Sequence, residues 1–224
     1  MGISEVKIKM CGMFRPEDIE AVNEVCPDYC GFIIDYPKSH RSVDRDILCR
    51  LRRGLRKETV PVGVFVDAPA ELIEELLLDG SIEIAQLHGN ESREVTAGIK
   101  ARTGKQVIKA FRIPAVSSDA DKELYTKVLR EAQKCPADYV LLDPGRGEGR
   151  PADFALLKNM LDETGFDREF FLAGGLDAGN ITDAVSTVHP YAVDLSSGIE
   201  TDRLKDPLKM KELKIILDSI EIYT

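Results

Sequence analysis

Two side chains capable of acid–base chemistry stand where short apolar runs end. Cys11 closes the run Val6–Cys11, and Asp143 closes the run Tyr139–Asp143. The period-two alternation of a strand places Cys11 on the same face as Lys9, and a cation beside a thiol favours the thiolate, a base or nucleophile. An apolar setting favours the neutral form of a carboxyl group, which makes Asp143 a candidate acid. A buried filler cysteine and a turn aspartate are the alternative interpretations.

Two later run ends carry groups suited to binding an anion. Gly174 and Gly175 follow the run Phe170–Ala173, and glycine lets backbone amides approach a charged ligand closely. The run Ala192–Ser196 ends in hydroxyl groups ahead of a short helical turn, whose first amides favour negative charge. Tight turns that bind nothing are the alternative. The predicted phosphate-binding residues are Gly174, Gly175, Ser196, Ser197 and Gly198.

Arg41 and His88 also follow apolar runs. Arg41 lies after the run Gly31–Ile34, where a guanidinium group can hold a carboxylate through two hydrogen bonds. A solvent-facing arginine is the alternative. His88 follows the run Ile82–Leu87, where it either orients a substrate or fills a turn, and nothing in its local sequence decides between the two.

The composition of the 224-residue chain is that of a soluble globular protein. Hydrophobic residues make up 43% and charged residues 31%, which excludes disordered and fibrous classes. A net charge of −9 opposes binding to nucleic acid, and the chain has no Trp for base stacking. No stretch approaches the roughly 20 apolar residues of a membrane-spanning helix, so we expect no membrane partner.

The cysteines and the N-terminus predict a cytoplasmic protein. Five cysteines are an odd number in a chain that is not small, which argues against a disulfide framework. Cys26 and Cys30 are the one close pair, and no histidine cluster accompanies them, so no metal site is expected. The segment Met1–Met10 reads as a strand and lacks a signal-peptide core.

Eight apolar runs alternate with segments of helical spacing, at 28 residues per unit on average over 224 residues. Continuous apolar runs suit a sheet that is covered on both faces, and strict alternation implies parallel strands. We therefore predict one (β/α)8 barrel domain over residues 1–224, without spare elements. An open doubly wound sheet is the alternative, but Cys11–Phe14 lacks its glycine fingerprint. The runs are Val6–Cys11, Gly31–Ile34, Val62–Val66, Ile82–Leu87, Val107–Phe111, Tyr139–Asp143, Phe170–Ala173 and Ala192–Ser196.

The ordered strand ends resemble those of the phosphoribosylanthranilate isomerase family, over a stretch from about Val6 to the last helix. No single motif is decisive, but the series in this order is specific. The matching segments are Lys9–Gly12, Pro37–Arg41, Gly63–Val66, Gln86–Gly89, Ile108–Ala110, Leu141–Asp143, Ala173–Leu176, Asn180 and Val193–Glu200.

The resemblance implies a ribulose-phosphate-binding barrel that performs an Amadori rearrangement in tryptophan biosynthesis. By resemblance, Asp143 is the general acid, Cys11 the general base, and Arg41 the residue that holds the anthranilate carboxylate. The phosphorylated sugar substrate would bind at the glycine and serine loops, and no cofactor is needed because an imine supplies the electron sink. The resemblance also marks further substrate-binding residues, which are Gln86, His88 and Asp194.

Two departures from the family pattern and two rival functions accompany this expectation. The loop Gly145–Phe154 differs from the usual pattern, which affects affinity or substrate range, and Asp35 is expected near Arg41 as a competitor for its charge. A bifunctional histidine/tryptophan isomerase would need a carboxylate in place of Cys11. A non-catalytic phosphosugar-binding sensor or scaffold would be expected to lose Cys11 or Asp143. The sequence does not predict the oligomeric state.

Overall fold

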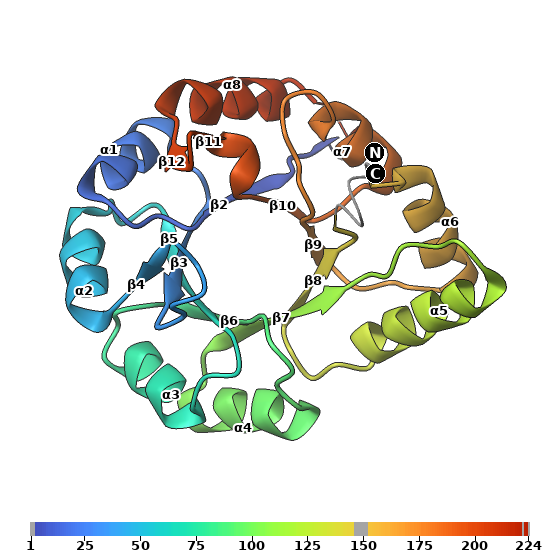
Figure 1. Cartoon of the computed structure of the whole chain (residues 1–224), viewed down its shortest axis with the longest axis horizontal. Coiled ribbons are helices and arrows are strands. Elements are labelled where there is room, and N and C mark those ends of the chain that lie inside the picture. Colours follow the sequence, from blue (N-terminus) through green and yellow to red (C-terminus); the bar gives the residue numbers. More distant parts are fainter. Residues whose placement is uncertain (1–2, 146–151, 221, 224) are drawn as a thin grey trace.

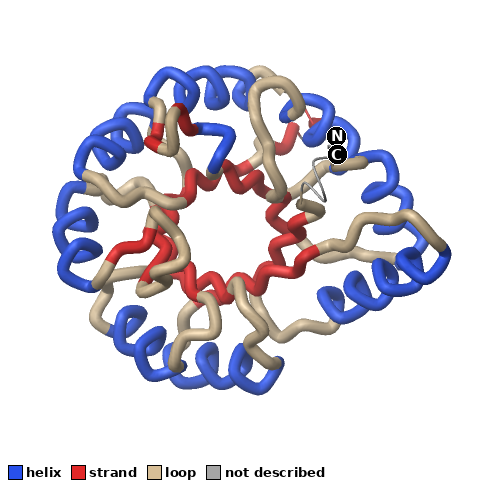
Figure 2. The backbone as a smooth tube through the Cα atoms, in the orientation of Figure 1, coloured by secondary structure: helices blue, strands red, loops and turns tan. Residues whose placement is uncertain are grey.

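The computed structural model describes residues 3–145, 152–220 and 222–223, and eight of its strands form a closed parallel barrel surrounded by eight helices (Figure 1; Figure 2). Hydrogen-bonded neighbours follow the order β2-β10-β9-β8-β7-β6-β5-β3, and pairing of β2 with β3 closes the ring. The predicted (β/α)8 architecture is confirmed. The barrel strands are β2 (Lys7–Cys11), β3 (Tyr29–Ile34), β5 (Val60–Phe65), β6 (Ile84–Leu87), β7 (Gln106–Arg112), β8 (Tyr139–Asp143), β9 (Phe170–Leu172) and β10 (Ala192–Leu195).

Five of the eight described helices begin at a side chain that caps the first turn. Ser92 and Asp153 accept hydrogen bonds from first-turn amides, and Asp206 caps the last helix in the same way, so backbone donors that lack helical partners are satisfied. The helices are α1 (Pro16–Val25), α2 (Arg45–Gly54), α3 (Ala70–Leu78), α4 (Arg93–Thr103), α5 (Asp119–Gln133), α6 (Phe154–Thr164), α7 (Ile181–Val188) and α8 (Pro207–Asp218).

The barrel carries additional short elements that were not predicted from the sequence. The expectation of no spare elements was therefore wrong. Each has two or three residues, which is too short for hydrophobic periodicity to reveal. One of them, β4, pairs with β3 just after the Arg41 loop, and the hairpin β11–β12 follows the serine loop. The short elements are β1 (Ile3–Ser4), β4 (Ser42–Val43), β11 (Glu200–Thr201), β12 (Leu204–Lys205), β13 (Ile222–Tyr223) and a 3-10 helix, Ser197–Ile199.

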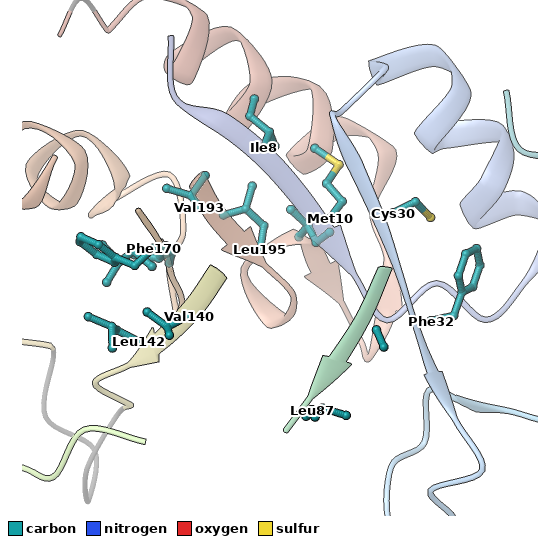
Figure 3. Close-up of a cluster of buried hydrophobic side chains, with 14 of the residues drawn as sticks. Ile8, Met10, Cys30, Phe32, Leu87, Val140, Leu142, Phe170, Val193 and Leu195 are labelled. Carbon is teal, nitrogen blue, oxygen red and sulfur yellow. The ribbon is translucent and has the colours of Figure 1, made fainter. Parts of the chain in front are cut away.

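The apolar core has two layers because successive strand residues point to opposite faces. The outer layer lies between strands and helices, and Figure 3 shows its members on β2, β3, β8 and β10. The inner layer fills the barrel, with Leu141 and Phe171 among its fully buried members. On β2 the inward positions instead carry Lys9 and Cys11, since Ile8 and Met10 take the outward positions in the helix-facing layer.

Gly63 on β5 lies in close contact with buried apolar side chains, which leave no room for a Cβ atom. A Cβ atom there would lie 2.6 Å from Ile82 Cδ1 and 2.9 Å from Phe65 Cε2. We predict that Gly63→Ala lowers the free energy of unfolding by about 1–3 kcal/mol through overpacking. Denaturant unfolding measures it, with Gly54→Ala as the control, because a Cβ at Gly54 comes no closer than 3.4 Å to a neighbour. Equal stability of Gly63→Ala and the wild type would contradict the packing described.

Candidate active site

A cavity of about 460 Å³ opens at the carboxyl ends of the barrel strands. In a parallel barrel these ends meet at one face, so residues far apart in the sequence gather there. Ten of the eleven predicted site residues line this cavity: Cys11, Arg41, Gln86, His88, Asp143, Gly174, Gly175, Asp194, Ser196 and Ser197. Gly198 is the exception. A Cβ on Gly198 would lie 2.0 Å from the carbonyl oxygen of Leu176, so this glycine packs the β10 loop against the β9 loop.

Part of the cavity wall was not predicted from the sequence. Ile33 on β3 and Val64 on β5 supply an apolar surface, and Tyr36 and Ser39 come from the loop after β3. Ile33 and Val64 could have been predicted to face the barrel interior, because period-two alternation from Tyr29 and Val62 places both on the inner face.

A buried ion pair lies beneath the cavity. The register of β2 and β10 sets Lys9 opposite Asp194, and Lys9 Nζ lies 2.8 Å from Asp194 Oδ1. The Lys9 side chain is fully buried and that of Asp194 is 8% exposed. Removing one partner of such a pair leaves an uncompensated buried charge, which typically costs about 3–5 kcal/mol. Lys7, two residues earlier, instead pairs with Asp28, so only Lys9 is buried beside the thiol.

The Cys11 thiol shares a small space with the Lys9 ammonium. A Cβ on Gly31, the partner of Cys11 in the adjacent strand, would lie 2.7 Å from Cys11 Sγ and 3.1 Å from Lys9 Nζ. Burial raises the pKa of the Cys11 thiol and Lys9 opposes this, with burial the larger effect. The expected effect of Lys9, which favours the thiolate, is therefore present, but desolvation of the anion outweighs it.

Asp143 reaches the cavity from the end of β8. Its Oδ1 atom accepts a hydrogen bond of 2.9 Å from the backbone amide of Gly145. A Cβ on Gly174 would lie 2.9 Å from the same oxygen, and Gly174 has a φ of +99°. Glycine at this position therefore serves Asp143 as well as the predicted anion loop. The unusual loop that follows lies partly outside the described residues, since positions 146–151 are not described.

Gln86 and His88 form a pair on the β6 side of the cavity. Gln86 Nε2 and His88 Nδ1 lie 2.9 Å apart, and Gln86 is 1% exposed. Burial lowers the pKa of His88, so its imidazole is neutral near pH 7. Gln86 Oε1 is buried without a hydrogen-bond partner among the described residues, so a ligand donor could satisfy it.

Arg41 is held by Glu200 rather than by Asp35. Arg41 Nε and Nη2 lie 2.5 and 2.7 Å from the two carboxylate oxygens of Glu200, and Lys205 Nζ lies 2.8 Å from Glu200 Oε1. No contact between Asp35 and Arg41 is found among the described residues, so the expected competition from Asp35 was wrong. Sequence reasoning missed Glu200 and Lys205 as site residues, although Glu200 ends the last segment of the resemblance.

The loops after β9 and β10 form the remaining wall. Gly174 and Gly175 both have positive φ, at 99° and 74°, which favours glycine at each position. The hydroxyl of Ser196 donates to the carbonyl oxygen of Cys11 at 3.3 Å and so ties the β10 loop to the end of β2. Ser197 begins the predicted short helical turn.

Among residues 3–145, 152–220 and 222–223, no group of three or more His, Cys, Asp or Glu is arranged to hold a metal ion. Within the same ranges, none of the helices is both long enough and apolar enough to cross a membrane.

The raised pKa of Cys11 predicts a slow thiol at neutral pH. Thiolate is the form that reacts with iodoacetamide, so we expect exposed Cys26 to be alkylated well before Cys11 at pH 7. Labelling of Cys11 should then accelerate as the pH rises above the ordinary thiol range. Mass spectrometry of digested protein measures both sites in one sample. Faster labelling of Cys11 than of Cys26 at pH 7 would contradict the burial effect.

Comparisons with known proteins identify the family. A family model described as N-(5'phosphoribosyl)anthranilate (PRA) isomerase matches residues 8–214. The N-(5'-phosphoribosyl)anthranilate isomerase of Endomicrobium trichonymphae is 38% identical over 219 residues, covering 96% of this chain and 99% of that protein. The enzyme of that name from Lachnoclostridium phytofermentans is 34% identical, with 92% and 95% covered.

Solved structures agree with the sequence relatives. The phosphoribosyl anthranilate isomerase of Thermotoga maritima is 31% identical with a TM-score of 0.78, covering 96% of this chain and all of that one. A second isomerase structure, in complex with reduced 1-(o-carboxyphenylamino)-1-deoxyribulose 5-phosphate, is 30% identical with a TM-score of 0.77, and covers 96% of this chain and 100% of its own. On its sequence, its barrel and its matches, this chain belongs to the phosphoribosylanthranilate isomerase family.

Proposed function

We propose that this chain converts N-(5-phosphoribosyl)anthranilate into 1-(2-carboxyphenylamino)-1-deoxyribulose 5-phosphate, a step of tryptophan biosynthesis. The observation that carries the proposal is the position of Cys11 and Asp143 on one cavity that Arg41 and the two glycine- and serine-bearing loops also line. A proton donor, a proton acceptor and groups suited to two anions therefore surround a space sized for a small ligand. The free cysteines and the phosphorylated substrate fit a reducing cytoplasm.

Asp143 acts first, as the general acid. It donates a proton to the furanose ring oxygen while the bond from C1 to that oxygen breaks. The lone pair of the anthranilate nitrogen then forms the C1=N bond, which gives an open-chain Schiff base. The hydrogen bond from Gly145 holds Asp143 Oδ1, so Oδ2 is the oxygen available to carry the proton.

Cys11 acts second, as the general base. Proton removal from C2 sends the C–H electron pair into a C1=C2 bond and the imine pair onto nitrogen, which gives an enolamine. Protonation at C1 and loss of the C2 hydroxyl proton then give the ketone. Lys9 stabilises the thiolate that this step requires, and the raised pKa of Cys11 implies that kcat/KM increases as the pH rises through that pKa.

Binding groups on the cavity wall would orient the substrate. The β9 and β10 loops would hold the phosphate, and Arg41 the anthranilate carboxylate. Gln86 Oε1, which has no hydrogen-bond partner among the described residues, would accept from a substrate hydroxyl or N–H group, beside neutral His88. Asp194 lines the same wall while holding Lys9.

Replacing the base tests the assignment of Cys11. We predict that Cys11→Ser lowers kcat by about 10²- to 10⁴-fold, because a hydroxyl is a far weaker acid than a thiol and seldom ionises. Affinity for a product analogue, measured by calorimetry, should stay close to that of the wild type. Cys30→Ser is the matched control, since Cys30 is also buried but lies in the outer core layer. A Cys11→Ser enzyme with wild-type kcat would remove Cys11 from the chemistry.

Replacing the acid tests Asp143 in the same assay. Asp143→Asn keeps the shape and the acceptor for the Gly145 amide but has no carboxyl proton to donate. We expect kcat to fall by about 10²- to 10⁴-fold with product-analogue binding retained. Full activity of this variant would assign the acid to another group. Absence of turnover by the wild-type protein itself would favour the phosphosugar-binding sensor.

A further inference from the structure

The Arg41 side chain is fixed along its whole length. Its stem lies against the backbone just after the catalytic cysteine, since a Cβ on Gly12 would meet Arg41 Cδ at 2.5 Å. Gly12 also has a φ of +82°. Both the close contact with Arg41 and the positive φ therefore favour glycine at this position. From there the guanidinium group reaches Glu200, 159 residues away in the sequence.

Glu200 occupies one of the two binding edges of the guanidinium group. Nε and Nη2 of Arg41 form parallel hydrogen bonds to its two oxygens, the two-bond geometry that best matches a carboxylate. The other edge, Nη1 with the second hydrogen of Nη2, has no hydrogen bond to a described residue. Arg41 is 19% exposed and lines the cavity, so this edge remains for a ligand.

Lys205 also binds Glu200, at the oxygen that accepts from Arg41 Nε. Its ammonium group is fully buried, 2.8 Å from Glu200 Oε1 and 3.0 Å from the carbonyl oxygen of Ser196. Burial raises the pKa of Glu200, but the hydrogen bonds from Arg41 and Lys205 outweigh it and bring the pKa to about 2. Glu200 is therefore ionised, and two cations with one carboxylate leave a single positive charge, which one ligand carboxylate would neutralise.

We propose that Glu200, held by Lys205, is a positioning residue that presents the free edge of Arg41 to the substrate carboxylate and so determines specificity for a carboxylated aromatic amine. The inference rests on the proposed function. Fixing a guanidinium group in advance reduces the entropy lost when a ligand binds. The opposing effect is repulsion between Glu200 and the ligand carboxylate, which Lys205 offsets by its charge.

The experiment compares two ligands that differ only in the carboxylate. They are 1-(2-carboxyphenylamino)-1-deoxyribitol 5-phosphate and its phenylamino counterpart, and calorimetry gives the ratio of their affinities for each variant. In the wild type we expect a preference of roughly ten- to a hundred-fold for the carboxylated ligand, the usual value of a charge-assisted contact. Arg41→Ala should abolish that preference.

Glu200→Gln is the decisive variant. An amide has one acceptor oxygen, and its nitrogen would face a donor of Arg41 in either orientation. The guanidinium group therefore loses its fixed orientation. We expect the preference to fall to within about three-fold, the KM of the full substrate to rise by roughly ten-fold or more, and kcat to change little. Glu200→Asp, which keeps the charge but shortens the reach, should recover part of the preference.

Glu91→Gln is the matched control. The Glu91 side chain is also only 3% exposed, but it pairs with Lys109 at 2.9 Å, does not line the cavity and is not bonded to Arg41. This variant should keep the wild-type ratio of affinities even if both affinities shift. An unchanged ratio of affinities in Glu200→Gln would overturn the inference. A larger ratio would also overturn it and would identify Glu200 as a competitor of the ligand carboxylate. No preference in the wild type, or a full preference in Arg41→Ala, would overturn the assignment of Arg41 and the inference with it.

Discussion

The ion pair between Lys9 and Asp194 is the interaction on which the rest of the site depends. It joins β2 to β10, and both partners are removed from water, so each is tolerated only because the other is present. Parallel register sets the two residues opposite each other, which brings the end of β2 beside the loop after β10, the loop that we propose binds phosphate. The same ammonium group then lies next to the Cys11 thiol, so one buried charge serves the closure of the barrel and the chemistry above it.

The groups nearest the proposed chemistry carry no net charge. Lys9 and Asp194 cancel each other beneath Cys11, and His88 is neutral because burial disfavours its cation. Positive charge is left over at Arg41, whose partner Glu200 is itself shared with Lys205. A substrate with a carboxylate at one end and a phosphate at the other would span this arrangement and place its sugar carbons between Cys11 and Asp143.

The barrel and its strand ends could be predicted from the sequence because each depends on local patterns. Continuous apolar runs gave the strands, and Cys11 and Asp143 stood at their ends. The Arg41–Glu200 pair could not be found this way, since its partners lie 159 residues apart and meet only when the barrel closes. The net effect on the pKa of Cys11 could not be predicted for a related reason: the sequence shows the neighbouring Lys9, which favours the thiolate, but not the depth of burial that raises the pKa. Likewise, Gly198 was expected to contact an anion, and its tight packing on Leu176 depends on how two loops meet.

The central claim is that Cys11 removes the proton from C2 of the sugar, and a kinetic isotope effect tests it most directly. Substrate carrying deuterium at C2 is compared with ordinary substrate in the wild-type and Cys11→Ser enzymes. Weakening the base makes proton removal the slow step, so the account predicts that deuterium slows Cys11→Ser more than it slows the wild type. Equal rates for the two substrates in Cys11→Ser would contradict the account, because the slowed step would then not break the C2–H bond.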